Sequence, residues 1–358
     1  MILLSPGPVN LSERVRNALL QPDLCHREPE FAELQTAIRT KLLNLYRLDL
    51  AQWAAILLTG SGTAAVEAIL TTLVPASGKL LIVENGVYGE RLSQIASIHH
   101  INHQRLSYPW GEAIDVEEID ACLEQAQGVT HLALIHHETT TGRLNRLSGI
   151  GELCKQRNIH LLIDGVSSFG AEELDFEAWG IAACAATANK CLHGVPGISF
   201  VIVHRETLPR PEVSKRTFYL DLESYCQRQD EGSTPFTQSV QTLYALNEAL
   251  DELRDQGGWQ VRQRNYRTLA NLVREGLLFL GFQPLLQRED SSVVLNAFHL
   301  PLGLSYQVFH DWLKANGFVI YAGQGRLARS IFRVSTMGAI TRQDMERFLA
   351  VVGAYYNA

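Results

Sequence analysis

The stretch His160-Leu161-Leu162-Ile163-Asp164-Gly165-Val166-Ser167-Ser168 is the most informative segment of this 358-residue chain. Its apolar run His160–Ile163 predicts a buried strand that ends at Asp164. Lys190 follows 26 positions later (190 − 164), at the end of Thr187-Ala188-Asn189-Lys190. A Gly/Pro-rich segment, Gly194-Val195-Pro196-Gly197, comes next. The segment therefore predicts a strand-end carboxylate and a lysine on a nearby turn.

Asp164 and Lys190 are the pair of groups that pyridoxal phosphate chemistry requires. The lysine amine holds the cofactor aldehyde as a Schiff base, and the carboxylate keeps the pyridine nitrogen protonated, so that the ring accepts electrons. Taken singly, an Asp at a strand end is more often a capping residue, and a Lys on a turn is more often a solvated surface residue. Other motifs of the chain are needed to distinguish the cofactor site from these two ordinary roles.

Composition and charge exclude several classes of protein. Hydrophobic residues make up 46% of the chain and charged residues 19%, which is typical of a globular protein with a sizeable core. The net charge of −7 and the absence of a basic stripe argue against a nucleic-acid partner. Six cysteines without a C-x-x-C pair predict reduced thiols and a cytoplasmic location. No signal peptide and no membrane span is expected.

Alternating strand-like and helical segments predict an α/β fold with a mostly parallel sheet flanked by helices. The expected strands of this sheet are Ala55–Leu58, Lys79–Val83, His131–Ile135, His160–Ile163 and Ile198–Val203. Beyond a long helix at 239–256, an α+β pattern includes the strands Val293–Phe298, Phe318–Tyr321 and Ile331–Ser335. We expect a large domain over residues 14–256. A small C-terminal domain is expected over 257–358, together with the N-terminal segment 1–13.

Three turns follow expected strands and carry candidate binding residues. Gly60-Ser61-Gly62-Thr63 opens a helix, whose free N–H groups and dipole suit a phosphate, although an ordinary N-cap has the same pattern. Tyr88 lies between Gly86 and Gly89, where its ring could stack on a planar cofactor or simply pack on apolar neighbours.

The third turn is His136-His137-Glu138-Thr139-Thr140-Thr141-Gly142. Consecutive strand residues point to opposite faces, so His136 and His137 are not expected to bind one metal ion. The three threonines are better suited to hydrogen bonds with a phenolic or carbonyl oxygen.

The order of these motifs resembles the class V aminotransferases, a family of fold-type-I pyridoxal phosphate enzymes. The resemblance extends from residue 2 to the end of the chain, and it implies a fold-type-I transferase with a smaller C-terminal α+β domain. The Glu-Thr-Thr-Thr-Gly run and the Gly194–Gly197 segment favour the branch of 2-aminoethylphosphonate–pyruvate aminotransferases. The phrases that carry the resemblance are Leu4-Ser5-Pro6-Gly7-Pro8, Gly60-Ser61-Gly62-Thr63, Glu138-Thr139-Thr140-Thr141-Gly142, Ser167-Ser168-Phe169-Gly170 and Ala188-Asn189-Lys190-Cys191.

The resemblance also implies which residues hold the cofactor and the substrate. Lys190 would form the Schiff base and Asp164 would contact the pyridine nitrogen, with the ring between Tyr88 and Val166. Arg333 would bind the substrate carboxylate or phosphonate, since its fork suits bidentate binding, although a lone Arg at a strand end is usually a surface ion pair. The other implied cofactor contacts are Ser61, Gly62, Thr63 and Thr187 at the phosphate, Thr139 near the phenolic oxygen, and Thr237 at the phosphate of a neighbouring subunit.

The implied reaction is a ping-pong transamination in a homodimer. 2-Aminoethylphosphonate and pyruvate would give phosphonoacetaldehyde and alanine. Val166 departs from the methionine expected in the phosphonate branch, so an alanine–glyoxylate or serine–pyruvate aminotransferase is the alternative. Two non-aminotransferase alternatives are a catalytically silent scaffold protein and a nucleotide-binding α/β protein. The glycine turn lacks both G-x-G-x-x-G and G-x-x-x-x-G-K-[ST], which counts against the nucleotide-binding protein.

Overall fold

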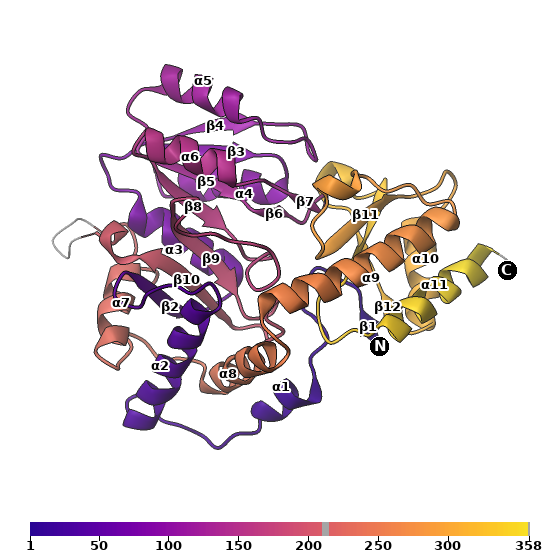
Figure 1. Cartoon of the computed structure of the whole chain (residues 1–358), viewed down its shortest axis with the longest axis horizontal. Coiled ribbons are helices and arrows are strands. Elements are labelled where there is room, and N and C mark those ends of the chain that lie inside the picture. The colour runs from indigo at the N-terminus through magenta and orange to yellow at the C-terminus, as the bar shows by residue number, and fades with distance from the viewer. Residues whose placement is uncertain (210–214, 357–358) are drawn as a thin grey trace.

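A seven-stranded sheet forms the centre of the computed structural model, which describes residues 1–209 and 215–356 (Figure 1). The strand order is β2-β10-β9-β8-β5-β3-β4. Strand β10 is antiparallel to β2 and β9, and the other neighbouring pairs are parallel. The mostly parallel sheet expected from the sequence is therefore confirmed. Its strands are β2 (Trp53–Thr59), β3 (Leu80–Glu84), β4 (His103–Ser107), β5 (His131–Ile135), β8 (His160–Asp164), β9 (Ile181–Thr187) and β10 (Ile198–His204).

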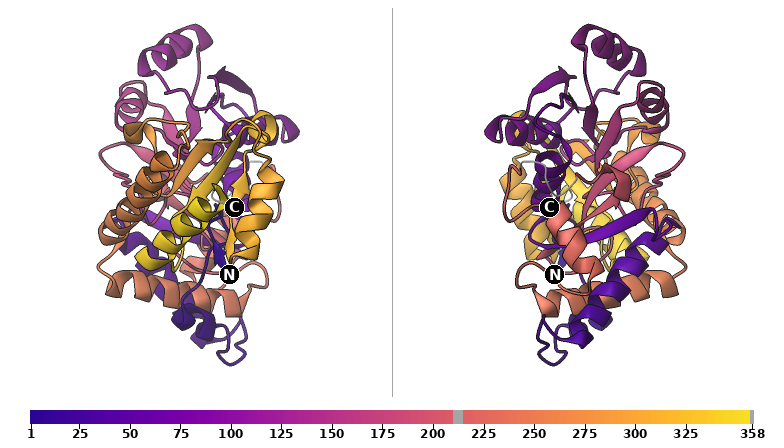
Figure 2. Two further views of the ribbon diagram at one scale, coloured as in Figure 1. Left: turned by 90° about the vertical axis from the view of Figure 1, so that its right-hand side faces the viewer. Right: turned by 90° about the vertical axis from the view of Figure 1, so that its left-hand side faces the viewer.

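Helices cover both faces of this sheet and make three layers (Figures 1 and 2). In β2, Ala55 and Leu57 pack on one face while Ile56 and Leu58 pack on the other, so both faces of this strand are apolar. One face is covered by α2 (Pro29–Asn44), α5 (Val116–Ala126), α6 (Ser148–Gln156) and α8 (Val240–Asp255). The other face is covered by α3 (Gly62–Leu73), α4 (Val87–Ile98) and α7 (Leu222–Asp230).

The C-terminal part of the chain has a sheet and an aromatic core of its own. Strand β1 pairs in parallel with β12, so the N-terminus belongs to this part of the molecule, as Figure 2 shows. The core includes Phe282, Phe298, Phe309 and Phe332, with Leu4 added from the N-terminal segment. The elements are β1 (Ile2–Leu3), α9 (Trp259–Phe279), β11 (Leu295–His299), α10 (Tyr306–Ala315), β12 (Phe318–Val319), β13 (Tyr321–Ala322), β14 (Ile331–Ser335) and α11 (Arg342–Tyr356).

Short elements complete the chain. Gly257 and Gly258 separate α8 from α9, and both have positive φ angles. The division into domains at residues 256 and 257 stays a prediction. The remaining elements are α1 (Glu13–Ala18), the hairpin strands β6 (His137–Glu138) and β7 (Arg143–Leu144), and the 3₁₀ turns η1 (Arg205–Thr207), η2 (Arg288–Asp290) and η3 (Gly325–Leu327).

The structure corrects the expected strands in two respects. Strands β4 and β9 have no counterpart among them, because β4 is a half-exposed polar edge strand and β9 is mostly alanine, a residue depleted in strands. The single strand expected at Phe318–Tyr321 is wrong. It divides at the buried Ile320 into β12, which pairs with β1, and β13, which pairs with β14.

The C-terminal aromatic core gives a stability prediction with an internal control. Phe332 is fully buried among three other phenylalanines, so Phe332→Ala should lower the free energy of unfolding by about 3–5 kcal/mol. Phe279 is 91% exposed, so Phe279→Ala should change it by less than about 0.5 kcal/mol. Urea denaturation followed by circular dichroism measures both. Equal losses from the two variants would contradict the assignment of this core.

Candidate active site

The carboxyl ends of β2, β3, β5, β8 and β9 lie at one edge of the central sheet. Ligands of open α/β sheets bind at such an edge. Asp164 is the last residue of β8, and the segments that follow the other four strands carry Ser61, Tyr88, Thr139 and Lys190. The topology therefore places these predicted site residues at one edge, although they lie up to 129 positions apart (190 − 61) in the sequence.

Lys190 lies in the turn after β9, and its amine donates a hydrogen bond to the backbone carbonyl of Pro6. Burial is the main reason that the pKa of Lys190 is lowered, and the positive charge of Arg333 acts in the same direction. A lowered pKa makes more of the amine neutral, which is the nucleophilic form.

Asp164 is the last residue of β8 and lies near the Lys190 amine. Its Oδ1 accepts a hydrogen bond from the Val166 backbone N–H at 2.9 Å, and within the described chain its Oδ2 has no hydrogen-bond partner. Burial raises the pKa of Asp164 to about 6, against the opposing effect of the positive charges of Arg91 and Lys190. One carboxylate oxygen is thus left for a further donor.

The phosphate-type turn lies at the start of α3. Ser61 is the N-cap, but no side chain caps this helix, so its first N–H groups are left for another acceptor. Thr63 Oγ1 accepts a hydrogen bond from Arg91 at 3.2 Å, and the Arg91 guanidinium lies 4.6 Å from the Tyr88 ring centroid. A Cβ atom at Gly62 would lie 2.8 Å from both γ-carbons of Val166. The turn therefore needs glycine at this position, because Val166 packs directly against it.

Arg333 is almost completely buried, with 1% of its surface exposed. Its guanidinium donates to the carbonyls of Thr139 (2.8 Å) and Ala322 (2.9 Å) and to Gln324 Oε1 (3.2 Å). In the described chain it forms no ion pair, so the alternative of a surface salt bridge is wrong. Burial lowers the pKa of Arg333, and the nearby Tyr88, Tyr306 and Glu138 side chains oppose this effect only in part.

Three of the predicted site residues have no hydrogen bond to Lys190 or Asp164 in the described structure. Ser61 and Thr237 are exposed, and Thr237 precedes Gln238, whose side chain accepts a hydrogen bond from Thr59 at the end of β2. Thr187 is the last residue of β9, and its hydroxyl lies 2.8 Å from Asn189 Oδ1 and 3.0 Å from the Ile198 carbonyl oxygen. These residues line the edge without contacting Lys190 or Asp164 within the described structure.

Two residues of the site were missed in the sequence. Arg91 could have been found from its position three residues after Tyr88, because residues i and i+3 share one face of a helix. Glu138 precedes Thr139 and is completely buried, and burial raises its pKa to about 7. No pattern in the sequence indicates that this carboxyl group turns inward.

His136 and His137 bind different partners. Nδ1 of His136 lies 2.9 Å from Ser168 Oγ, and Nδ1 of His137 lies 3.1 Å from the Ser167 carbonyl oxygen. Burial lowers their pKa values to about 3 and about 4. Among residues 1–209 and 215–356 no cluster of three or more His, Cys, Asp or Glu side chains is arranged to hold a metal ion.

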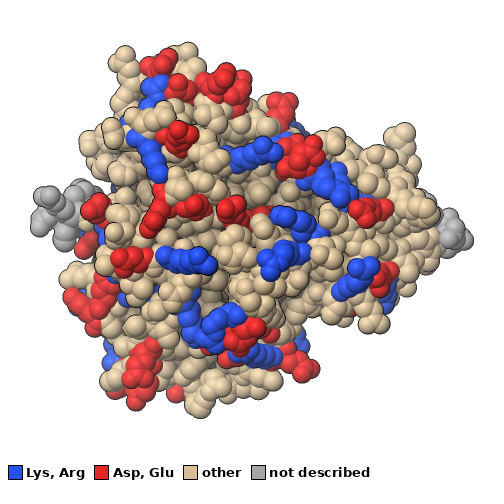
Figure 3. All heavy atoms as spheres, viewed as in Figure 1, with Lys and Arg blue, Asp and Glu red and all other residues tan. Residues whose placement is uncertain are grey.

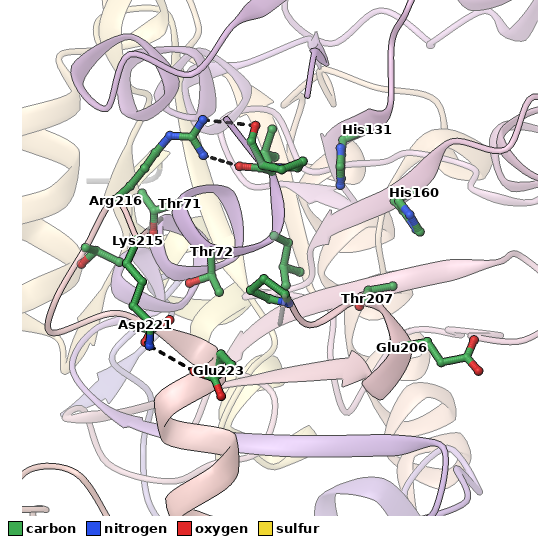
Figure 4. A pocket seen from close by; sticks show the side chains of 15 residues that line it. Thr71, Thr72, His131, His160, Glu206, Thr207, Lys215, Arg216, Asp221 and Glu223 are labelled. Atoms are coloured by element: carbon green, nitrogen blue, oxygen red, sulfur yellow. Dashed lines mark hydrogen bonds and ion pairs between the residues drawn. The ribbon is translucent and has the colours of Figure 1, made fainter. Parts of the chain in front are cut away.

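A cavity of about 250 Å³ lies at the opposite edge of the sheet, near the start of β5 and β8 (Figure 4). Its lining includes His131 and His160, but its cations are already satisfied. Lys215 forms ion pairs with Asp221 and Glu223, while Arg216 donates to the Val74 and Pro75 carbonyls. This cavity contains none of the predicted site residues.

The residues at the carboxyl edge fit pyridoxal phosphate. The uncapped start of α3 offers N–H groups to a phosphate, Asp164 offers a carboxylate oxygen, and Lys190 offers an amine with a lowered pKa. On the surface seen in Figure 3 basic and acidic side chains are interspersed, so this face carries no extended basic area of the kind that binds nucleic acid. None of the described helices combines the length and apolarity needed to cross a membrane.

Comparisons with known proteins agree with this site. Residues 16–348 match the family model described as aminotransferase class-V. The chain is 36% identical over 356 residues to a 2-aminoethylphosphonate–pyruvate transaminase of Vibrio cholerae, covering 98% of this chain and 96% of the other. A protein of the same name from Bacteroides fragilis is 34% identical over 355 residues, with 98% of both chains covered.

Solved structures show the same fold. The crystal structure of an alanine–glyoxylate aminotransferase from Nostoc superposes with a TM-score of 0.93 at 27% identity, and covers 99% of this chain and 95% of the other. The fold-type-I architecture expected from the sequence is confirmed. The chain belongs to the class V aminotransferases, and it is a pyridoxal-phosphate-dependent enzyme.

Proposed function

We propose that this aminotransferase transfers the amino group of 2-aminoethylphosphonate to pyruvate, which gives phosphonoacetaldehyde and alanine. The observation that carries the proposal is the buried guanidinium of Arg333, which has hydrogen bonds to neutral acceptors but no anionic partner among the described residues. A carboxylate or phosphonate group would supply the missing charge through a bidentate contact. Full-length similarity to transaminases named for this pair of substrates supports the choice of donor and acceptor.

In the proposed mechanism each side chain has one task. Pyridoxal phosphate, when bound, supplies an aldehyde that exchanges amines and a ring that accepts electrons. Lys190 would hold the aldehyde through its Nζ and, as a free amine, would act as the base that moves a proton at the substrate Cα. Asp164 would hold a proton on the ring nitrogen through its free carboxylate oxygen. Tyr88 and Val166 would provide the side chains that pack against the ring.

The remaining tasks concern the phosphate and the phenolic oxygen. Ser61, Gly62 and Thr63 would bind the phosphate at the start of α3, with Thr187 as a further contact. Arg91, which donates to Thr63, would add positive charge at this place. Thr139 would serve the phenolic oxygen of the ring.

We also propose that the active unit is a homodimer, in which Thr237 reaches the phosphate site of the partner. Thr237 is exposed next to an aromatic cluster that comprises Phe218, Tyr219 and Phe236. Phe218 is 85% exposed and Tyr219 is 42% exposed, as expected for surface that a second copy covers.

The six cysteines are all unpaired, which supports the proposal of a reducing, cytoplasmic location.

Alanine–glyoxylate transamination is the second candidate, because Val166 and the likeness to the Nostoc enzyme favour it. Initial rates with purified enzyme separate the two candidates. We expect kcat/KM for 2-aminoethylphosphonate with pyruvate to exceed that for alanine or serine with glyoxylate by at least about tenfold. The reverse order of the two values would replace the proposed substrates.

Replacement of Arg333 tests the anion site. Arg333→Gln removes the cation but keeps hydrogen-bond donors, and it should lower kcat/KM for 2-aminoethylphosphonate or pyruvate by about 100-fold, mainly through a higher KM. Arg342 is exposed and paired with Glu346, so Arg342→Gln should leave both constants unchanged. Steady-state kinetics measure the effect. An unchanged KM in Arg333→Gln would show that the substrate anion binds elsewhere.

The raised pKa of Asp164 predicts opposite effects on stability and activity. Between about pH 4 and pH 6 the folded, cofactor-free protein keeps a proton that the unfolded chain releases, so its stability falls as the pH rises through this window. The variant Asp164→Asn has no carboxyl group at this position, so this decrease in stability with rising pH should be absent. The variant should therefore unfold at higher temperature than the wild type above about pH 7, with a gain of about 3 kcal/mol.

Asp164→Asn should at the same time lower kcat by about 10²-fold to 10³-fold, because the ring nitrogen loses its anionic partner. Thermal unfolding of the cofactor-free proteins and steady-state kinetics of the loaded enzymes measure the two effects. A variant that is less stable than wild type at every pH would contradict the view that burial makes this carboxylate costly.

A further inference from the structure

Helix α4 carries Tyr88 in its first turn, but it has no cap of its own. The N-cap residue is Gly86, which has no side chain to accept a hydrogen bond from the first turn. The first N–H groups of a helix have no partner within the helix, and they are usually satisfied by a nearby side chain. The position of Tyr88 therefore depends on acceptors that come from elsewhere in the chain.

The acceptors come from the turn after β5, about 50 residues further along the chain. Glu138 Oε2 accepts from the Gly89 N–H at 3.2 Å, and Thr140 Oγ1 accepts from the Val87 N–H at 3.1 Å. Glu138 Oε1 accepts from the Thr140 N–H at 3.0 Å, so both carboxylate oxygens face N–H donors. A negative charge at this place is also favoured by the helix dipole.

The contact is close enough to restrict the residue at the N-cap. A Cβ atom at Gly86 would lie 2.3 Å from the carboxyl carbon of Glu138, so no side chain fits between them. Glu138 itself is completely buried. A buried carboxylate is costly unless it is needed for hydrogen bonds, and here it completes the first turn of a helix that contributes to the site.

The same turn also holds Arg333. The carbonyl oxygen of Thr139, between the two capping residues, accepts from the Arg333 guanidinium at 2.8 Å. Three consecutive residues thus fix an aromatic side chain on α4 and a cation on β14. In the proposed function, the aromatic side chain contacts the cofactor ring and the cation binds the substrate anion.

We propose that Glu138 is a positioning residue of this enzyme: its carboxylate caps α4 from outside the helix and so fixes Tyr88 and the Thr139 carbonyl relative to the cofactor. The proposal rests on the proposed function for the roles of Tyr88 and Arg333. It goes further because it assigns a task to a residue that contacts neither substrate nor cofactor in that scheme.

Glu84 provides a matched control. It is also buried (5% exposed), and it also contacts α4, although it ends β3 of the central sheet whereas Glu138 ends the hairpin strand β6. Its carboxylate oxygens accept from the hydroxyls of Ser93 (2.8 Å), which lies further along α4 than Tyr88, and of Ser107 (2.6 Å) on β4. A variant at Glu84 therefore reports the loss of a buried carboxylate packed against α4 without the loss of the cap.

The test compares Glu138→Gln with Glu84→Gln at about pH 8, which lies above the pKa of about 7 of the buried Glu138 carboxyl, so that this carboxylate is mostly ionised in the wild type. In Glu138→Gln the new NH₂ group faces a backbone N–H donor in either orientation of the amide. One of the two hydrogen bonds made by the carboxylate is therefore lost. We expect about tenfold weaker binding of pyridoxal phosphate to the cofactor-free protein, a reduced visible circular dichroism of the bound cofactor, and a higher KM for pyruvate. Glu84→Gln should lower thermal stability and leave these three readouts unchanged.

Thr140 supplies an independent pair of variants, which keeps the test decisive if Glu138→Gln does not fold. Thr140→Val removes the acceptor of the Val87 N–H and should reproduce the effects of Glu138→Gln, whereas Thr140→Ser keeps the hydroxyl and should behave as wild type. Wild-type cofactor affinity and circular dichroism in Glu138→Gln or Thr140→Val would overturn the proposal, as would equal changes in Glu84→Gln.

The two cofactor readouts do not depend on the amino donor. A wild-type enzyme that binds pyridoxal phosphate but fails with 2-aminoethylphosphonate would reject the proposed substrate and leave the comparison of Glu138 with Glu84 intact.

Discussion

Partial burial of charged groups at the carboxyl edge of the central sheet is the constraint on which the site depends. Burial lowers the pKa of the Lys190 amine and raises that of the Asp164 carboxyl, so each group on its own is pushed toward its neutral form. The positive charges of Arg91 and Lys190 act against this effect at Asp164. The edge therefore keeps an amine ready to react next to a carboxylate that gains from a cationic partner, such as a protonated ring nitrogen.

The architecture supplies this constraint through strand order. β8 and β9 are neighbours in the sheet, so Asp164 at the end of β8 and Lys190 in the turn after β9 come together at the same edge. The N-terminal segment closes the edge from the other part of the molecule, because Pro6 accepts from Lys190 while β1 pairs with β12. Arg333 on β14 reaches the same edge through the Thr139 carbonyl. The site is thus built jointly by the central sheet and the C-terminal part.

Much of this arrangement could be predicted from sequence because it rests on local signals. Apolar runs predict β2, β3, β5 and β8. The polar residues at the ends of these runs predict Gly62, Tyr88, Thr139 and Asp164 as site residues. The remainder depends on tertiary contacts. The alanine-rich β9 becomes a strand because β8 and β10 lie on either side of it, not through its own propensity. Glu138 turns inward because Gly86 leaves room for it, and no periodicity marks such a contact across 50 positions.

The most direct test of the central claim is to identify the lysine that bonds to pyridoxal phosphate. Borohydride reduction of the loaded enzyme fixes the cofactor to its amine, and peptide mass spectrometry then locates the modified residue. The chain has six lysines, and Lys190 is the one that lies in the turn after β9 at the carboxyl edge of the central sheet. We expect modification of the peptide that contains Lys190 and of no other. Modification at a different lysine, or at none, would contradict this assignment.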